Sequence, residues 1–170
     1  MRFLRILVLV AVAVVMGGCK DVPVVDPTTP KGDTLKDNMI TANRYMNGSE
    51  DTRIDGYLSR RGWQAERLSN GVRYIATAPG RGAAIQAGDT VAIAYSVETL
   101  AGESVYPMRR DTVVCGRMMP TAGLDAALPR MSVGGKGTVI VPSRQGYGVA
   151  GDGDRIRSRM ILVYKLRIEN

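Results

Sequence analysis

The stretch GGKGTVIVPSRQGYG, residues 134–148, carries the strongest signals for fold and function in this chain. Its glycines allow a tight turn, and the apolar run at 138–141 is typical of a buried strand. Pro142 ends this strand, because proline lacks the N–H that the next ladder bond needs. The polar loop that follows holds Tyr147 between two glycines. A tyrosine in such a loop has little core to fill, so we expect it at the mouth of a pocket.

Alternating apolar residues on both sides of this stretch predict an antiparallel sheet. The clearest signals are an Asn-Gly turn at 70–71, typical of a hairpin, and the alternation over 162–168. A short helix precedes Pro129, because proline interrupts helices. We therefore expect a short helix at 122–128 and strands at 63–68, 72–78, 91–97, 103–106, 112–115, 138–141 and 162–168.

Four segments together resemble the FKBP-type peptidyl-prolyl isomerases. Residues 142–148, PSRQGYG, resemble the family's P-S/P-x-x-A-Y-G loop. Residues 88–106, GDTVAIAYSVETLAGESVY, and 122–137, AGLDAALPRMSVGGKG, resemble the two preceding family segments. Ile156 followed by MILVYKLRI at 160–168 resembles the last segment. Each motif alone is weak, but the set is specific, and it covers about the last hundred residues.

The resemblance implies an α+β fold, in which a twisted antiparallel sheet of five or six strands wraps around one short helix. It implies a pocket between helix and sheet, and an isomerase that acts on proline-containing polypeptides. No cofactor or metal is expected for this activity. The residues that match the family's pocket are Tyr95, Tyr106, Thr121, Leu124, Tyr147, Ile156 and Tyr164.

The resemblance also implies a role for each pocket residue. Tyr95 forms a wall, Tyr106 flanks the prolyl ring, and Leu124 forms the floor. The loop residue Tyr147 hydrogen-bonds the ligand carbonyl, and the backbone N–H of Thr121 is a second donor. The two remaining matches are apolar residues of the loop and of the deep pocket, Ile156 and Tyr164.

Several positions depart from the family pattern. Pro107 stands where the family has an aspartate, so a polar contact is missing. Pro120 has no N–H next to the expected donor, and Leu124 replaces a tryptophan found in many members. These departures leave two hypotheses open: an active isomerase, or a non-catalytic binding or chaperone-like module on the same fold.

The first residues resemble a bacterial lipoprotein signal. Basic Arg2 and Arg5 precede an apolar segment at 6–16 that is too short to span a bilayer. Small residues and Cys19 follow, which favours cleavage before Cys19 and acylation of that cysteine over an ordinary secretory signal. We expect anchoring in the cell envelope, and Lys20 favours an outer membrane where one exists. The sequence does not indicate which side of that membrane carries the protein.

The next residues divide into a tether and a helical extension. Residues 1–18 form the expected signal peptide, and 19–32 are proline-rich, which is typical of a flexible tether. Residues 33–62 predict two helices, at 33–47 and 49–61, separated by Asn47-Gly48. These helices either pack on the sheet or dimerise the chain. Beside the isomerase and the binding module, a third hypothesis for the whole protein is a structural envelope lipoprotein whose helices dimerise. The isomerase-like domain then spans residues 63–170.

Charge and residue content exclude several other functions. The chain has 170 residues and a formal net charge of +7, but its basic residues are scattered, so we expect no nucleic-acid partner. The chain contains no histidine, which removes most zinc sites and serine triads. Once Cys19 is acylated, only Cys115 remains, and no internal disulfide is possible. The Asp152-Gly153-Asp154 loop lacks the spacing of a calcium site and predicts a turn.

Overall fold

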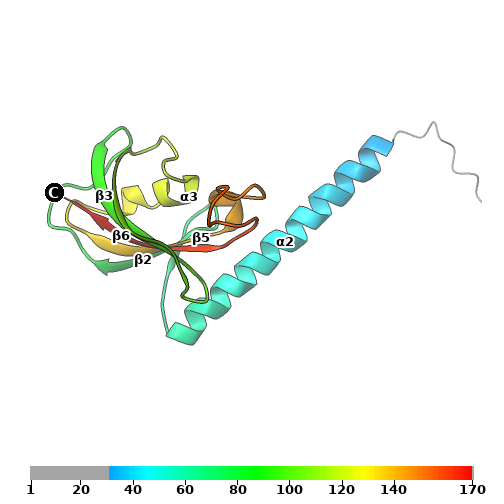
Figure 1. Cartoon of the computed structure of the whole chain (residues 1–170), viewed down its shortest axis with the longest axis horizontal. Helices are drawn as coiled ribbons and strands as arrows, with labels where there is room; N and C mark the ends of the chain where they lie inside the picture. The colour runs from blue at the N-terminus through cyan, green and yellow to red at the C-terminus, as the bar shows by residue number, and fades with distance from the viewer. Residues whose placement is uncertain (1–30, 170) are drawn as a thin grey trace, which may run out of the picture. The chain divides into compact units, whose positions relative to one another are not determined.

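The computed structural model describes residues 31–169, with side chains from Thr34 onward. Six strands form one sheet in the order β1-β2-β5-β6-β3-β4, and all neighbours are antiparallel. Figure 1 shows this twisted sheet with the short helix α3 against one face. The elements are α2 (Lys31–Arg61), β1 (Glu66–Arg67), β2 (Arg73–Ala78), β3 (Thr90–Thr99), β4 (Ser104–Val114), α3 (Ala122–Asp125), η1 (Leu128–Arg130), β5 (Lys136–Val141), η2 (Ser143–Gln145) and β6 (Leu162–Ile168).

The core between α3 and the sheet follows the alternation in the sequence. On β6, Leu162, Tyr164, Leu166 and Ile168 are all at most 2% exposed. Lys165 and Arg167 alternate with them and point to the other face. The α+β fold expected from the sequence, an antiparallel sheet around one short helix, is therefore confirmed.

The predicted hairpin at 63–78 is also present. Strands β1 and β2 pair in antiparallel register, and Leu68 N–H donates to the Val72 carbonyl at 2.9 Å. Gly71 has φ +85° in the turn, a conformation that favours glycine. The Asn-Gly pair thus forms the turn that the sequence indicates.

One strand is longer than expected. The two segments predicted at 103–106 and 112–115 form a single strand, β4, of 11 residues. Pro107 lies inside it. β4 is an edge strand, so a proline N–H is not needed on its open side. The pairing of β4 with β3 skips a residue beside this proline, so the strand continues through a bulge.

The two predicted N-terminal helices are one helix, α2, which begins at Lys31 and ends at Arg61. Asn47 and Gly48 do not interrupt it, so this part of the prediction was wrong. A glycine inside a helix costs only about 1 kcal/mol relative to alanine. Thr52 Oγ1 donates to the Gly48 carbonyl at 2.9 Å within the same helix.

Residues 41–61 of α2 belong to the same compact unit as the sheet, whereas the preceding unit ends at Ile40. Their apolar residues form a second core on the sheet face opposite α3. Polar contacts accompany this packing: Arg73, whose side chain is 3% exposed, donates to Asp55 at 2.9 Å and to Asp51 at 3.4 Å. The second core contains Ile54, Tyr57, Leu58, Ile140, Ile161 and Val163.

The short helix α3 is positioned by its cap and by a close approach to β5. Thr121 Oγ1 accepts a hydrogen bond from Leu124 N–H at 3.2 Å, as an N-cap does. A Cβ on Gly123 would lie 2.3 Å from Val141 Cγ1, so only glycine permits this packing distance. The helix predicted at 122–128 is shorter than expected, because α3 ends at Asp125 and a separate 3-10 helix, η1, follows with Pro129 inside it.

Among the described residues, no helix is both long and apolar enough to cross a membrane. The expected lipobox, with Cys19, lies outside the residues that the structure describes.

Candidate active site

The structure brings the seven predicted pocket residues together on the α3 face of the sheet. Tyr95 on β3 and Tyr164 on β6 lie on adjacent strands, with ring centroids 5.8 Å apart and planes tilted by 47°. Leu124 on α3 belongs to the same core cluster, as does Ile156 from the loop before β6. The half-buried rings of Tyr106 and Tyr147 pack against this cluster. Thr121, buried at the start of α3, completes the set.

Tyr147 faces this cluster because of the turn that precedes it. η2 is closed by Gly146 N–H, which donates to the Ser143 carbonyl at 3.0 Å, and Gly148 N–H donates to the same carbonyl at 2.8 Å. Burial raises the pKa of Tyr147, and the nearby Tyr95 and Asp152 raise it further, whereas Arg109 opposes them. Because its ring packs against the core cluster, Tyr147 faces the predicted site rather than turning away from it.

The floor of the site is closely packed. Leu124 is 0% exposed, Ile156 3% and Tyr95 5%. The accessible surface of the site comes from the two half-buried tyrosines at its rim, Tyr106 and Tyr147. A ligand would first meet these two phenols before it reached the apolar floor.

Asp152 is a site residue that the sequence analysis missed. Its carboxylate accepts a short hydrogen bond from the Tyr106 hydroxyl. Its other oxygen accepts from the N–H groups of Asp154 at 2.9 Å and Ile156 at 2.8 Å. Thus Asp152 supplies a carboxylate near the place where Pro107 had suggested that a polar contact was lost. The only signal was the Asp-Gly-Asp turn, which did not identify its distant partner.

These contacts shift the pKa values of both groups. The hydrogen bond to Asp152, with burial and the charges of both loop aspartates, raises the pKa of Tyr106 to about 12. Burial alone would raise the pKa of Asp152, but donation from Tyr106 and from backbone N–H groups outweighs it and holds the pKa below the usual range. At neutral pH Tyr106 is therefore a neutral donor to an ionised carboxylate.

Cations lie beside the ring of Tyr106. The Arg109 guanidinium carbon is 4.2 Å from the ring centroid, and that of Arg155 is 5.6 Å away. Arg155 also donates to the Val105 carbonyl at 3.3 Å. Such cation–π contacts restrict the orientation of the ring. The orientation of Tyr106 is thus fixed by the hydrogen bond of its hydroxyl and by the arginines that contact its ring.

A second carboxylate that the sequence did not single out supports the segment before α3. Asp125 is 8% exposed and accepts from Gly116 N–H at 2.8 Å and from Met118 N–H at 3.0 Å. In the α3 cap, Thr121 acts only as an acceptor. Its side-chain oxygen accepts from Leu124 N–H, and its carbonyl oxygen accepts from Asp125 N–H at 3.0 Å. The cap therefore does not involve the Thr121 N–H that was predicted as a ligand donor.

Comparison with known proteins identifies the architecture. A family model described as FKBP-type peptidyl-prolyl cis-trans isomerase matches residues 82–169. The chain belongs to this family. The match includes all seven predicted pocket residues, although their individual roles stay predictions.

Solved structures of FKBP-type and other peptidyl-prolyl isomerases share the fold. A peptidyl-prolyl cis-trans isomerase from Pseudomonas syringae pv. tomato str. DC3000 superposes with a TM-score of 0.62 at 23% identity, covering 75% of this chain and 93% of that one. AtFKBP13 superposes with a TM-score of 0.58 at 19% identity, covering 63% of this chain and 98% of that one. No curated protein sequence matches the chain.

The deep end of this FKBP-type site carries an unpaired polar atom. The hydroxyl of Tyr164, a residue 1% exposed, has no hydrogen-bond partner among the described residues. Burial raises its pKa far above the usual range. Tyr147 and Thr121 lie near enough to act as loose hydrogen-bonding neighbours without forming a bond of normal geometry, and the first raises the pKa whereas the second lowers it. A buried hydroxyl without a partner costs about 1–3 kcal/mol.

The site holds no other reactive group. Within residues 31–169 no cluster of three acidic, cysteine or histidine side chains could bind a metal ion. Cys115 is a free, buried thiol whose pKa is raised by burial and by Asp125 and Asp89, so it stays protonated. An apolar floor with phenol donors can bind a twisted amide, but it offers no nucleophile.

Proposed function

We propose that this protein catalyses cis–trans isomerisation of peptidyl-prolyl bonds in exported polypeptides at a membrane surface. The observation that carries the proposal is the position of Tyr147, which the η2 turn places over the apolar floor formed by Tyr95, Leu124 and Tyr164. The family and the fold support the same activity.

The chemistry requires no reactive side chain. The barrier to rotation about the prolyl amide is about 20 kcal/mol and comes from amide resonance. A low-dielectric floor disfavours the planar, charge-separated amide relative to the twisted one. Donors that bind the carbonyl more tightly in the twisted state lower the barrier further. In this proposal Tyr147 Oη and Thr121 N–H are those donors.

A proline isomerisation assay with the purified protein tests this proposal. Replacing Tyr147 with phenylalanine removes one hydrogen bond to the substrate, so we expect kcat/KM to fall about tenfold. Leu124→Ala should lower it as well, by removing the apolar floor. The matched control is Tyr45→Phe, because Tyr45 is 80% exposed on α2. A wild-type rate equal to the uncatalysed rate would exclude the enzyme.

The alternative is a non-catalytic binding module on the same fold. The low exposure of Leu124, Ile156 and Tyr95, at most 5%, favours it, since little of the floor is open to a ligand. In that case client polypeptides would bind equally well to the wild type and to Tyr147→Phe. Client binding without isomerisation would support this reading.

Attachment to the membrane is part of the proposal and rests on the sequence signal. A multiply acylated Cys19 would hold the protein on the envelope, because stable anchoring takes more than one chain. Fractionation and mass spectrometry of the wild type and Cys19→Ala would test it. Recovery of unmodified wild-type protein in the soluble fraction would contradict the anchor.

Dimerisation through the N-terminal helix also stays a prediction. Leu35 and Met39, on one face of α2, are 62% and 58% exposed. These side chains are thus uncovered in a single chain, as a dimerising face requires.

A further inference from the structure

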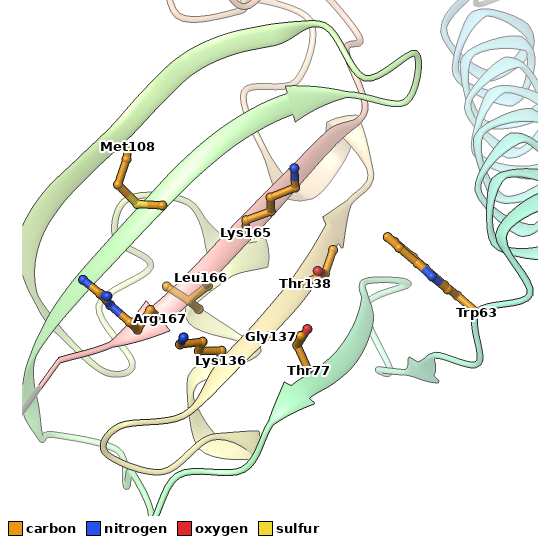
Figure 2. A pocket seen from close by; sticks show the side chains of 9 residues that line it. All are labelled: Trp63, Thr77, Met108, Lys136, Gly137, Thr138, Lys165, Leu166 and Arg167. Carbon is orange, nitrogen blue, oxygen red and sulfur yellow. The ribbon is translucent and has the colours of Figure 1, made fainter.

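A hollow lies on the face of the sheet opposite the isomerase site. It has a volume of about 480 Å³, and we call it the outer groove. Figure 2 shows its side chains reaching out from neighbouring strands. Lys165 and Arg167 come from β6, Lys136 and Thr138 from β5, and Trp63 and Met108 lie at opposite ends.

The groove exists because α2 covers only part of this face. Ile54, Tyr57 and Leu58 of the helix pack on Ile140 and Val163, and Trp63 follows directly after the helix. The Trp63 ring stands edge-on to Tyr57, with centroids 6.0 Å apart and planes at 81°. The aromatic wall of the groove is therefore held by the helix.

Small residues of β3 lie beside the groove on the same face of the sheet. Ala94 pairs with Arg167, and Ser96 pairs with Lys165, on neighbouring strands. Strand alternation turns both small residues to this face, because Tyr95 between them points into the core. Met108 on the edge strand is 61% exposed and Trp63 is 38% exposed. Two exposed apolar anchors thus flank a shallow channel.

Positive charge dominates the channel. Lys165 pairs with Glu98 at 2.5 Å, whereas Arg167 and Arg110 share one carboxylate, Glu169, at 2.8 and 3.0 Å. Lys136 forms no ion pair with any side chain in residues 34–169. Cations therefore outnumber the carboxylates that neutralise them, and the excess charge lies between the apolar anchors.

We propose that the outer groove binds an extended, acidic polypeptide segment with apolar residues between its carboxylates. Charge complementarity selects the acidic residues, and the apolar anchors select the side chains between them. Tryptophan, methionine and arginine are enriched in protein interfaces. A concave channel fits a single chain better than it fits a flat lipid surface, so the occupant is a polypeptide.

The dimensions determine the length of the segment. From β2 to β4 the sheet crosses four strand spacings, which is about 19 Å. An extended chain rises about 3.3 Å per residue, so about six residues span the channel. The groove faces away from Tyr147, and its occupancy does not depend on the proposed isomerase activity.

Trp63 provides the probe, because it is the only tryptophan in the chain. The purified full chain is titrated with an eight-residue peptide of alternating aspartate and leucine, and Trp63 emission is followed. We expect a saturable change that weakens as salt rises, because the charges are exposed. The same peptide with lysine in place of aspartate should give no change.

Charge-reversal variants locate the binding. Lys136→Glu should weaken the acidic peptide about tenfold, because it replaces an attractive charge with a repulsive one. Lys36→Glu is the matched control, since Lys36 is exposed and does not line the groove. Met108→Ala should weaken binding without any change in charge. Prolyl isomerisation should be the same in all three variants, so failure of the isomerase proposal would not affect this test.

Three results would overturn the proposal. The first is no Trp63 response to the acidic peptide up to millimolar concentration. The second is equal weakening by Lys136→Glu and Lys36→Glu, which would indicate net charge rather than a groove. The third is binding to phosphatidylglycerol vesicles with no binding to the peptide, which would make the surface a membrane contact.

Discussion

Glu50 offers the sharpest test of how the N-terminal helix supports the isomerase site. This residue of α2 is 7% exposed, and its carboxylate accepts from Ser143 N–H at 2.9 Å and from the Ser143 hydroxyl. Ser143 opens η2, and its carbonyl accepts from Gly148 N–H on the far side of Tyr147. A buried carboxylate on the helix thus holds the start of the loop that carries the predicted donor.

The magnitude for Glu50→Ala follows from these contacts. The change leaves a buried N–H and a buried hydroxyl without their acceptor, at about 1–3 kcal/mol each. Removing the buried charge offsets part of this loss of stability, because the folded protein no longer has to desolvate a carboxylate. We expect the free energy of unfolding to fall by about 3 kcal/mol, and by less in Glu50→Gln, which keeps one acceptor oxygen.

Urea unfolding followed by Trp63 emission measures this loss, and the isomerisation assay measures its effect on the site. Because Ser143 positions the loop, kcat/KM should fall about tenfold in Glu50→Ala under conditions where the protein is folded. Glu103→Ala is the matched control, since Glu103 is exposed and forms no ion pair among the described side chains. A double-mutant cycle with Ser143→Ala isolates the pair.

Two outcomes would refute this reasoning. The first is a stability change in Glu50→Ala within about 0.5 kcal/mol of the wild type, the range of ordinary surface substitutions. The second is a coupling energy near zero between positions 50 and 143. Either would mean that the helix and the loop are held by their apolar contacts alone.

Three further predictions concern other parts of the molecule. Tyr164→Phe should raise the free energy of unfolding by about 1 kcal/mol, because it removes an unpaired buried hydroxyl; a loss of stability in urea would show that the hydroxyl has a partner. Asp152 has a lowered pKa, so its stabilising effect is complete above the unfolded pKa of about 3.9 and disappears as pH falls through the lower folded value. The stability gap between the wild type and Asp152→Asn, measured by urea unfolding, should therefore close below about pH 4, and a gap independent of pH would contradict the assignment. Leu35→Glu combined with Met39→Glu should convert a dimer into a monomer in sedimentation equilibrium, and a wild-type monomer at high concentration would exclude dimerisation.

Strands and turns were predictable where the signal is local. The alternation over 162–168 and the Asn-Gly pair at 70–71 correspond to β6 and to the β1–β2 turn. Side-chain alternation and positive-φ glycines act over a few neighbouring residues, so a single sequence contains them. The positions of the seven pocket residues followed from the family resemblance, which orders these strands and the helix around one site.

Local sequence signals gave wrong element boundaries where tertiary packing stabilises a helix or strand by more than a glycine or proline destabilises it. Gly48 predicted an interruption of the helix, and 103–106 and 112–115 were predicted as separate strands, but α2 and β4 are each continuous. The burial of residues 54–58 on the sheet stabilises the helix by more than a glycine costs. An edge position removes the need for the proline N–H. Such decisions depend on neighbours that are distant in the chain.

The sequence alone thus determined the strand periodicity, the turn positions, and the loop that carries Tyr147. Only the tertiary structure decided which carboxylate meets which donor, as Glu50 meets Ser143 and Asp152 meets Tyr106, 93 and 46 residues apart. It also decided how far α2 covers the sheet, and so left the outer groove open. Any of the many carboxylates could form such a bond; the folded chain selects the one whose backbone lies within reach.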